Sequence, residues 1–427
     1  MIRQFDVTTG KQIRQFPGHE SGTGFVRFLA GGKTLMSINN DNTVRIRDVE
    51  SGKLLQQSSV SSGEAYRAAL SRDEKLIVTI GGKLRLLDAA TGELLRSFEH
   101  ERTRIRAAAF SPNGKLIAAA GDAPLHTRAA GFLGALTDAT STATAVRLWD
   151  LKSGKEVHRF DRDPRTFGRT EHKRREVADV LFSPDGKTLA TAEVDGVVML
   201  YEVATGGIRR QLAGHEGRIR GLAFSADGKR LATGGSVDLT ALVWDLASRT
   251  DGLAVSDLSP EQLQSLWAEL SSPDATKAYQ AIVTLAAARK QSIAFLDKVL
   301  QPVAKPSPQH LAELINRLDS KQFKDREEAT KELSELGRVA SASLEETLKT
   351  TTSFEIRSRV RQLLAKLLQP PKFSKSELQS WRAIEILERV ANSDAQRLLG
   401  RLAKGASRAN ITQEATAALA RVSNRLQ

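Results

Sequence analysis

The segment VRLWDLKSGKEVHRF, residues 146–160, contains the pattern that decides the fold of the N-terminal half of this 427-residue chain. A run of alternating apolar residues ends in the acid Asp150, and a Ser-Gly-Lys turn at residues 153–155 separates it from a second such run. Alternation with a period of two indicates strands, and a glycine in a short turn supplies the positive φ that a tight hairpin needs. The segment therefore predicts a β-hairpin.

The same pattern recurs through the N-terminal half. The acids in the equivalent position are 42, 40, 62, 52 and 43 residues apart, at Asp6, Asp48, Asp88, Asp150, Glu202 and Asp245. A second series of turns, with sequences such as SPDGK, begins at Leu29, Ser71, Ser111, Ser183 and Ser225. Four short strands in a unit of about 42 residues are typical of a β-propeller blade. We predict five full blades and a half blade over residues 1–256.

These repeats resemble the WD-repeat family. The resemblance rests on the Trp-Asp pairs at 149–150 and 244–245, the Gly-His pairs at 18–19 and 214–215, and the SPDGK turns. It implies a buried hydrogen-bonded network of His, Ser or Thr, Asp and Trp in each blade, with a structural role and no catalytic one. The matching positions are His215, Thr233, Asp238 and Trp244 in the last blade, His172, Thr191 and Asp195 in the blade before it, and His19, Ser37 and Asp41 in the first full blade.

Two insertions in the repeat point to a binding surface, at residues 122–143 and 161–176. The resemblance puts both kinds of loop on one face of the disc, and loops on a rigid scaffold commonly carry function. The alternative is a pair of tolerated insertions without a role. The residues expected to contact a partner are Phe132, Leu133 and Leu136 in the first insertion and Arg165, Phe167, Arg169, Lys173, Arg174 and Arg175 in the second.

The start of each first strand adds a third candidate patch. Positions four and six residues before the end of these strands hold large or cationic side chains in several blades. They are Tyr66, Arg104, Arg106, Arg218 and Arg220. In WD-repeat proteins these positions ring the central channel on that same face, and Arg and Tyr often anchor interfaces. Arginines engaged in ordinary surface salt bridges are the alternative interpretation.

After Leu253 the pattern changes to the 3.6-residue period of helices. Ser259 followed by Pro260 is typical of a helix N-cap and first helical residue. Residues 323–349, FKDREEATKELSELGRVASASLEETLK, resemble a HEAT-type repeat, and residues 381–405 contain a shorter version. We therefore predict an all-α domain, a HEAT-like α-solenoid over residues 257–427, in which helix pairs stack to bury their apolar faces.

The composition excludes several kinds of chemistry. The chain has no cysteine, so disulfides and thiolate metal sites are excluded. Gly-Lys-Thr at 32–34 and 186–188 lacks the earlier glycine of a phosphate-binding loop, and His126, His158 and His310 have no metal-ligand spacing. Neither a signal peptide nor an apolar run long enough to span a bilayer is visible, so we expect a cytoplasmic protein that is not an enzyme and needs no metal or cofactor.

These observations predict a non-catalytic scaffold that binds a protein or peptide. The resemblance to bacterial WD-repeat proteins with a helical C-terminal extension implies a role in signalling. The net charge of +13 leaves nucleic acid as an alternative partner, bound by the basic C-terminal helices and the Arg-rich insertion. Only 5% of the residues are aromatic, which offers few surfaces for base stacking.

Counting strands also predicts an open ring. Residues 2–7 and 12–16 match only a third and a fourth strand, and after Trp244 the chain has room for one outer strand before Pro260. We expect the missing strands to be encoded upstream of Met1, or the gap to be covered by the solenoid or by another chain.

Overall fold

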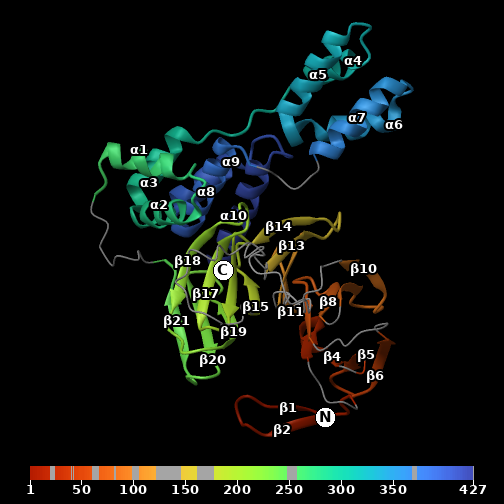
Figure 1. Cartoon of the computed structure of the whole chain (residues 1–427), viewed down its shortest axis with the longest axis vertical. Coiled ribbons are helices and arrows are strands. Elements are labelled where there is room, and N and C mark those ends of the chain that lie inside the picture. The colour runs from red at the N-terminus through yellow and green to blue at the C-terminus, as the bar shows by residue number, and fades with distance from the viewer. Residues whose placement is uncertain are drawn as a thin grey trace, which may run out of the picture. The chain divides into compact units, whose positions relative to one another are not determined.

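The structure is a computed structural model, and it describes residues 1–19, 25–39, 41, 43–59, 67–80, 83–98, 105–121, 146–160, 177–247, 257–367 and 373–426. The chain divides into two compact units, Met1–Leu246 and Ala247–Gln427 (Figure 1). The first unit is built of antiparallel β-sheets and the second of α-helices, as the sequence predicted.

Strands that are consecutive in the chain pair with one another in every sheet of the first unit. We number the sheets as blades 1 to 5, after a half blade of two strands, β1 (Ile2–Phe5) and β2 (Gln12–Phe16). Blade 1 contains β3 (Phe25–Leu29), β4 (Thr34–Asn39), β5 (Thr43–Asp48) and β6 (Leu54–Ser59); blade 2 contains β7 (Arg67–Leu70), β8 (Leu76–Ile80), β9 (Leu84–Asp88) and β10 (Leu94–Phe98); blade 3 contains β11 (Ile105–Phe110), β12 (Leu116–Gly121), β13 (Val146–Asp150) and β14 (Glu156–Phe160). Blade 4 contains β15 (Val177–Phe182), β16 (Thr188–Glu193), β17 (Val197–Glu202) and β18 (Ile208–Ala213), and blade 5 contains β19 (Ile219–Phe224), β20 (Arg230–Gly235) and β21 (Ala241–Asp245).

The propeller-type fold is therefore confirmed. Blade 5 has three strands among the described residues, and the segment predicted to form its fourth strand lies almost wholly outside them. Within the described part of the chain, no sheet combines strands from both ends of the unit, so the ring is open as predicted.

The acid that recurs in the sequence closes the turn after the third strand in the half blade and in blades 1 to 4. The Asp150 carboxylate accepts a hydrogen bond from the backbone N–H of Ser153 at 2.7 Å, and Asp48 does the same with Ser51 at 2.7 Å. In blade 4 the longer Glu202 accepts instead from the hydroxyl of Thr205 at 2.6 Å. The carboxylate thus satisfies a donor that the turn would otherwise leave without a partner.

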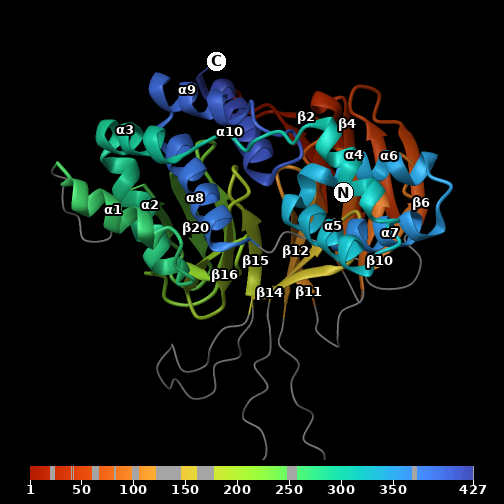
Figure 2. The ribbon, with the colours of Figure 1, turned by 90° about the horizontal axis from the view of Figure 1, so that it is seen from above.

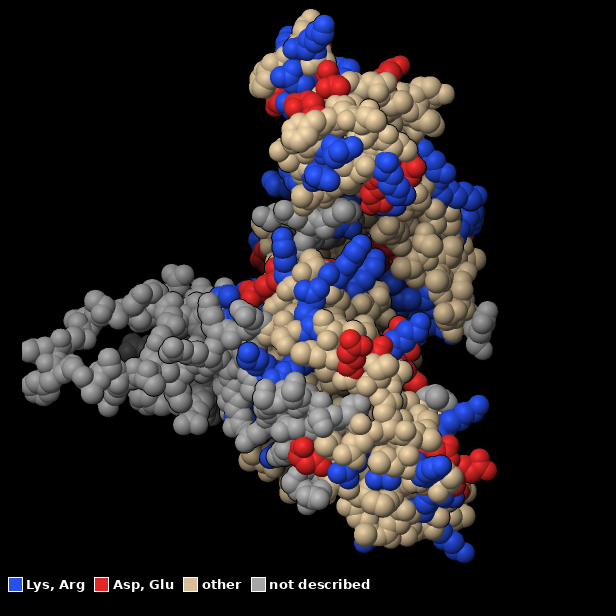
Figure 3. Space-filling model, turned by 90° about the vertical axis from the view of Figure 1, so that its right-hand side faces the viewer, with Lys and Arg blue, Asp and Glu red and all other residues tan. Residues whose placement is uncertain are grey.

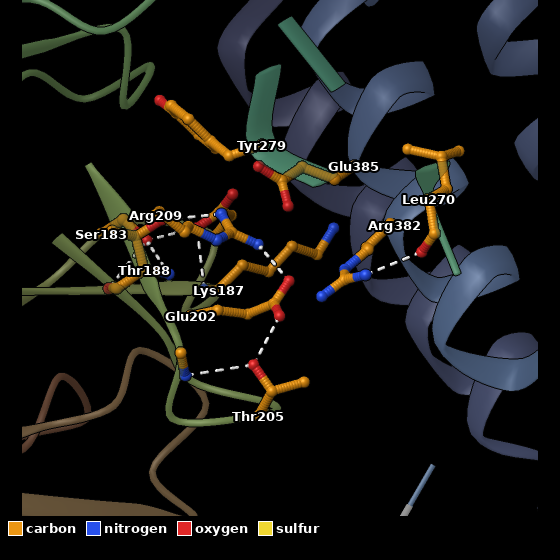
Figure 4. Close-up of polar contacts among 12 residues, drawn as sticks. Ser183, Lys187, Thr188, Glu202, Thr205, Arg209, Leu270, Tyr279, Arg382 and Glu385 are labelled. Atoms are coloured by element: carbon orange, nitrogen blue, oxygen red, sulfur yellow. Dashed lines mark hydrogen bonds and ion pairs between the residues drawn. The ribbon is translucent and has the colours of Figure 1, made fainter. Parts of the chain in front are cut away.

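The second turn series depends on its serine. In blade 4 the Ser183 hydroxyl oxygen accepts from the backbone N–H of Thr188 at 2.9 Å and donates to Asp185. The Thr188 hydroxyl accepts from Arg209 at 2.9 Å, and Arg209 also lies 3.1 Å from Glu202 (Figure 4). The turn and the outer strand of blade 4 are therefore joined by one polar cluster.

The hydrophobic cores of this unit lie between adjacent blades. In blade 4, Ala190, Ala192, Val198 and Leu200 are at most 1% exposed and pack in one cluster with Leu231 and other residues of blade 5. The equivalent sets in the earlier blades are buried against the blade that follows each of them. These are Met36, Ile38 and Val44 in blade 1, Val78, Ile80, Leu84 and Leu86 in blade 2, and Ala118, Ala120, Val146 and Leu148 in blade 3.

Aromatic side chains connect successive blades at a fixed position. Phe98 at the end of β10 contacts Trp149 of blade 3, with ring centroids 5.9 Å apart. Phe160 at the end of β14 contacts Tyr201 of blade 4 in the same way, at 5.2 Å. Tilted aromatic pairs of this kind are worth about 0.5–1.5 kcal/mol beyond their burial. The residue before the recurring acid therefore receives a side chain from the preceding blade.

The second unit begins at a well-capped helix. Ser259 accepts from the backbone N–H of Gln262, whose side chain bonds back to the backbone of Ser259, and Pro260 is the first helical residue. The helices are α1 (Pro260–Glu269), α2 (Ala275–Ala287), α3 (Arg289–Val299), α4 (Pro308–Arg317), α5 (Phe323–Leu336), α6 (Ser341–Thr350), α7 (Phe354–Leu367), α8 (Lys375–Val390), α9 (Ser393–Leu402) and α10 (Asn410–Leu426).

These helices form two groups, which Figures 1 and 2 both show. Helices α4 to α7 pack around Leu318, Leu333 and Leu344, with α4 against α5, α6 against α7, and the two pairs in contact through α5 and α7. Helices α1 to α3 pack instead with α8 to α10, and α8 is the centre of that group. Helix α8 is buried on most of its circumference, its charged residues Arg382, Glu385 and Glu388 included, because helices from both sides of it in the chain surround it. Stacking therefore departs from strict chain order in this group.

Candidate interaction face of the propeller

Both insertions leave the propeller at the same end of its sheets. In blade 3, Gly121 at the end of β12 pairs with Ile105, and Val146 at the start of β13 pairs with Phe160 at the end of β14. The first insertion follows Gly121 and precedes Val146, while the second follows Phe160 and precedes the start of β15. We call this end of the blades, where first and third strands begin and second and fourth strands end, the loop end.

Many of the predicted contact residues lie outside the described residues. These are Tyr66, Arg104, Phe132, Leu133, Leu136, Arg165, Phe167, Arg169, Lys173, Arg174 and Arg175. The described members of the prediction are Arg106, Arg218 and Arg220, and all three lie at the loop end.

A β-bulge marks the start of the first strand in three successive blades. The register shifts between Ile105 and Ala107, between Val177 and Asp179, and between Ile219 and Gly221. The extra residues in these bulges are Arg106, Ala178 and Arg220. A bulge bends its strand and redirects the side chain of the extra residue. The arginines at positions 106 and 220 therefore occupy a special backbone position that repeats from blade to blade.

Arg67, which the sequence analysis did not select, connects these bulges. Its guanidinium donates to the carbonyl oxygen of Arg106 in blade 3 and to that of Ala178 in blade 4, at 3.3 Å in each case. One side chain from the start of β7 thus bonds the backbone of two other blades. The sequence signal was its place directly after Tyr66, but the two carbonyl groups that Arg67 bonds lie 39 and 111 positions further along the chain, which sequence alone does not indicate.

Asp179 brings an acid to this cluster. Burial raises the pKa of its carboxyl, while the N–H of Val180, 2.9 Å away, and the charge of Arg67 act in the opposite direction. Arg220, by contrast, is exposed. An exposed guanidinium can bind a carboxylate with two parallel hydrogen bonds or stack on an aromatic ring, which suits it to a protein partner.

The predicted network residues of blade 5 form a continuous hydrogen-bonded chain. Trp244 Nε1 donates to the Thr233 hydroxyl oxygen at 2.9 Å, and that hydroxyl lies 2.7 Å from His215 Nε2. His215 Nδ1 lies 2.7 Å from the Asp238 carboxylate. Because a carboxylate only accepts, Nδ1 is the donor, and in the neutral ring Nε2 then accepts from Thr233.

This network fixes the backbone of the loop end. The Asp238 carboxylate also accepts from the backbone N–H of Glu216, at 3.1 Å, and from that of Thr240, at 3.2 Å. Burial alone would raise the pKa of Asp238, but the bonds from His215 and from these backbone groups outweigh it and lower that pKa. The His215 side chain is fully buried. This hydrogen-bonded network is therefore suited to holding two loops together and presents no accessible nucleophile.

The other blades contain parts of the same arrangement. In blade 1, His19 lies 2.8 Å from Asp41 through Nδ1 and 2.9 Å from the Ser37 hydroxyl through Nε2. In blade 4, Asp195 accepts from the N–H of Val197 at 3.2 Å. The buried Thr191 hydroxyl has no partner among the described residues, and His172, predicted to bond it, lies outside them.

Comparison with known proteins assigns these repeats. The model of the WD40 family, described as WD domain, G-beta repeat, matches residues 92–123, 165–202 and 206–245. The N-terminal unit therefore contains WD40 repeats, which confirms the predicted resemblance.

Several curated proteins are similar over this region. Autophagy-related protein 16 of Arabidopsis thaliana is 24% identical over 219 residues, covering 51% of this chain and 37% of the relative. WD repeat-containing protein 1 of Gallus gallus is 29% identical over 212 residues, covering 44% and 34%. WD repeat-containing protein 91 of Rattus norvegicus is 24% identical over 254 residues, covering 57% and 32%. The chain thus spans about a third of the length of these relatives. Similarity to WD-repeat proteins supports an interaction scaffold.

Among the described residues, the His, Asp and Glu side chains include no group of three or more that could hold a metal ion. None of the helices in the described ranges has both the length and the apolar character that crossing a membrane requires.

Proposed function

We propose that this protein is a non-catalytic scaffold that binds a protein partner at the loop end of its propeller. One observation carries the proposal: the bulged Arg106 lies at the same end of blade 3 as the stems of both insertions. These stem residues are Gly121, Val146 and Phe160. Bulges and long loops on a rigid sheet are typical of places where proteins present side chains to a partner.

The opposite end of the blades offers less to a partner. Its turns are short, and their donors are used by the turn itself, as in the bonds from Ser153 to Asp150 and from Thr188 to Ser183. The contrast between the two ends favours the loop end as the binding surface.

We infer that the helical unit is a second platform. A groove of about 530 Å³ lies between α5 and α7 and is lined mainly by polar side chains, among them Thr330, Lys331, Gln362 and Lys366. A polar groove between paired helices suits an extended peptide rather than an apolar ligand. A scaffold with two platforms fits a role in bacterial signalling assemblies, which the resemblance to bacterial WD-repeat proteins implies.

We do not extend the proposal to nucleic acid. Many arginines of the C-terminal helices lie beside carboxylates, which lowers their capacity to bind phosphates. The pairs include Arg359 with Glu327 and Glu355, Arg408 with Glu345, Arg421 with Glu388 and Glu414, and Arg425 with Glu388. Figure 3 shows basic side chains beside acidic ones over the helices at the top of that view.

The test compares charge reversal at the two ends of the blades. The full chain and the variant Arg106→Glu/Arg220→Glu are used to capture partners, which are identified by mass spectrometry and then purified for titration. Reversing two interface arginines should weaken binding at least tenfold, the equivalent of about 1.4 kcal/mol, with little change in melting temperature.

The control variant Lys75→Glu/Lys115→Glu makes the same change of charge in turns at the opposite end. It should bind the partner as the unchanged protein does. Equal loss in both variants, or full binding by Arg106→Glu/Arg220→Glu, would contradict the proposal. Salt-dependent binding of random-sequence DNA would favour the nucleic-acid alternative.

A further inference from the structure

One face of blade 5 has the composition of an interface between blades, but no blade among the described residues packs on it. Its residues Ala232, Gly234, Ala241 and Val243 are equivalent in register to Ala190, Ala192, Val198 and Leu200 of blade 4. The blade 4 residues are at most 1% exposed because blade 5 covers them. In blade 5, Ala232 and Ala241 are exposed and Val243 is 67% exposed.

The half blade presents the complementary surface. Phe5 stands before Asp6 at the position of Trp149 and Tyr201, where each blade receives a side chain from the preceding one. Phe5 is nevertheless 52% exposed. The other face of the half blade is engaged, because Phe16 is 1% exposed and lies close to Gly52 of the turn after β5.

The two surfaces belong to opposite ends of the row of blades (Figure 1). Each is one half of an interface that the chain builds four times between its own blades, and in this structure neither is covered by the other. An exposed apolar sheet face and an unpaired strand edge tend to associate.

We propose that the open face of blade 5 docks against the half blade of a second copy of this chain, with Val243 packed near Phe5 of the partner copy. Such a contact is heterologous, because two different surfaces meet. The partner surface on the second copy is inferred from the interface that repeats within the chain. Each of blades 2 to 5 offers one face to the blade before it. Among the described residues, the half blade presents the same kind of face.

The absence of cysteine from the sequence makes a direct test practicable. The full-length single variants Phe5→Cys and Val243→Cys are mixed in equal amounts and treated with a short bismaleimide cross-linker. The expected product is a covalent dimer containing one chain of each variant, identified by mass. A mixture of Leu95→Cys with Val243→Cys is the matched control, since Leu95 is 48% exposed but lies on the outer strand of blade 2.

Sedimentation analysis over a range of concentrations provides the second measurement. The unchanged protein should associate as its concentration rises, and Val243→Glu or Phe5→Glu should keep it monomeric with an unchanged circular dichroism spectrum. Monomers at every concentration with no mixed dimer would overturn the proposal. So would an intramolecular cross-link in the double variant Phe5→Cys/Val243→Cys, which would indicate that the ring closes within one chain, or protection of the Val243→Cys thiol by the helical unit of a monomer.

Discussion

Val146 and Phe160 pair across β13 and β14, so the first strand residue after one insertion lies beside the last residue before the other. The two segments are separate in sequence, and the antiparallel order of the sheet brings their stems together. This pairing makes the loop end a single surface, on which the proposed partner contact depends.

The network of blade 5 should contribute measurably to stability. Thr233→Val removes the hydroxyl that accepts from Trp244 and bonds His215, which leaves Nε2 of the buried His215 and Nε1 of the half-buried Trp244 without that partner. We expect a loss of about 1–3 kcal/mol in the free energy of unfolding, measured with urea and circular dichroism. Ser37→Ala in blade 1 should cost less, because Arg47 replaces the tryptophan there. Equal stability of Thr233→Val and the unchanged protein would show that the network is not formed.

Two adjacent glycines of blade 5 should respond differently to alanine. A Cβ on Gly235 would lie 2.0 Å from the Asp238 carboxylate and 2.7 Å from His215 Nδ1, whereas a Cβ on Gly234 would meet nothing within 4 Å. Gly235→Ala should therefore cost about 1–3 kcal/mol by forcing the network apart. Gly234→Ala should change the melting temperature little. The idea fails if both variants melt at the same temperature.

Gly196 should be irreplaceable for a reason beyond its own conformation. Its φ is +90°, and a Cβ there would lie 2.2 Å from the backbone carbonyl oxygen of His215 in the next blade. Gly114 also has a positive φ, +66°, but a Cβ would meet nothing within 4 Å. Gly114→Ala should cost about 1–2 kcal/mol through backbone strain alone, and Gly196→Ala should cost clearly more. Thermal unfolding of both variants measures the difference, and a similar loss in both would contradict it.

The turn of blade 4 should become weaker in acid. Burial alone would raise the pKa of Asp185, but the charge of Lys187 and the bond from Ser183 outweigh it and bring the pKa to about 2, below the ordinary value of 3.8. A carboxyl whose pKa falls on folding stabilises the protein above its unfolded value and loses that effect as the pH drops through the folded value. The stabilisation should therefore be complete above about pH 4 and disappear toward pH 2.

Asp185→Asn isolates this charge effect. Blade 3 already has Asn113 at the equivalent position, where it accepts from the Ser111 hydroxyl at 2.8 Å and from the N–H of Lys115 at 3.0 Å. Asparagine at 185 should thus preserve the turn's hydrogen bonds while removing its charge. Urea unfolding from pH 2 to pH 6 should show the largest difference from the unchanged protein above pH 4. A difference independent of pH would contradict the assigned cause.

The positions of turns and strands were readable from the sequence because their determinants are local. Asp150 bonds a residue three positions later, and Ser183 bonds one five positions later, so short motifs report these structures directly. The capped start of α1 at Ser259 and Pro260 was readable for the same reason.

The tertiary structure decided what depends on residues distant in the chain. Arg67 reaches a backbone carbonyl 111 positions away, and α2 packs on α8, where Arg382 bonds the carbonyl oxygen of Leu270 112 positions away. The bulges at Arg106 and Arg220 arise from the pairing of two strands, which a single strand's sequence does not specify. The exposure of Val243 and Phe5 likewise depends on the arrangement of the blades. Both are apolar residues at positions that are buried between blades elsewhere in the unit, and they are exposed because no neighbouring blade among the described residues covers them.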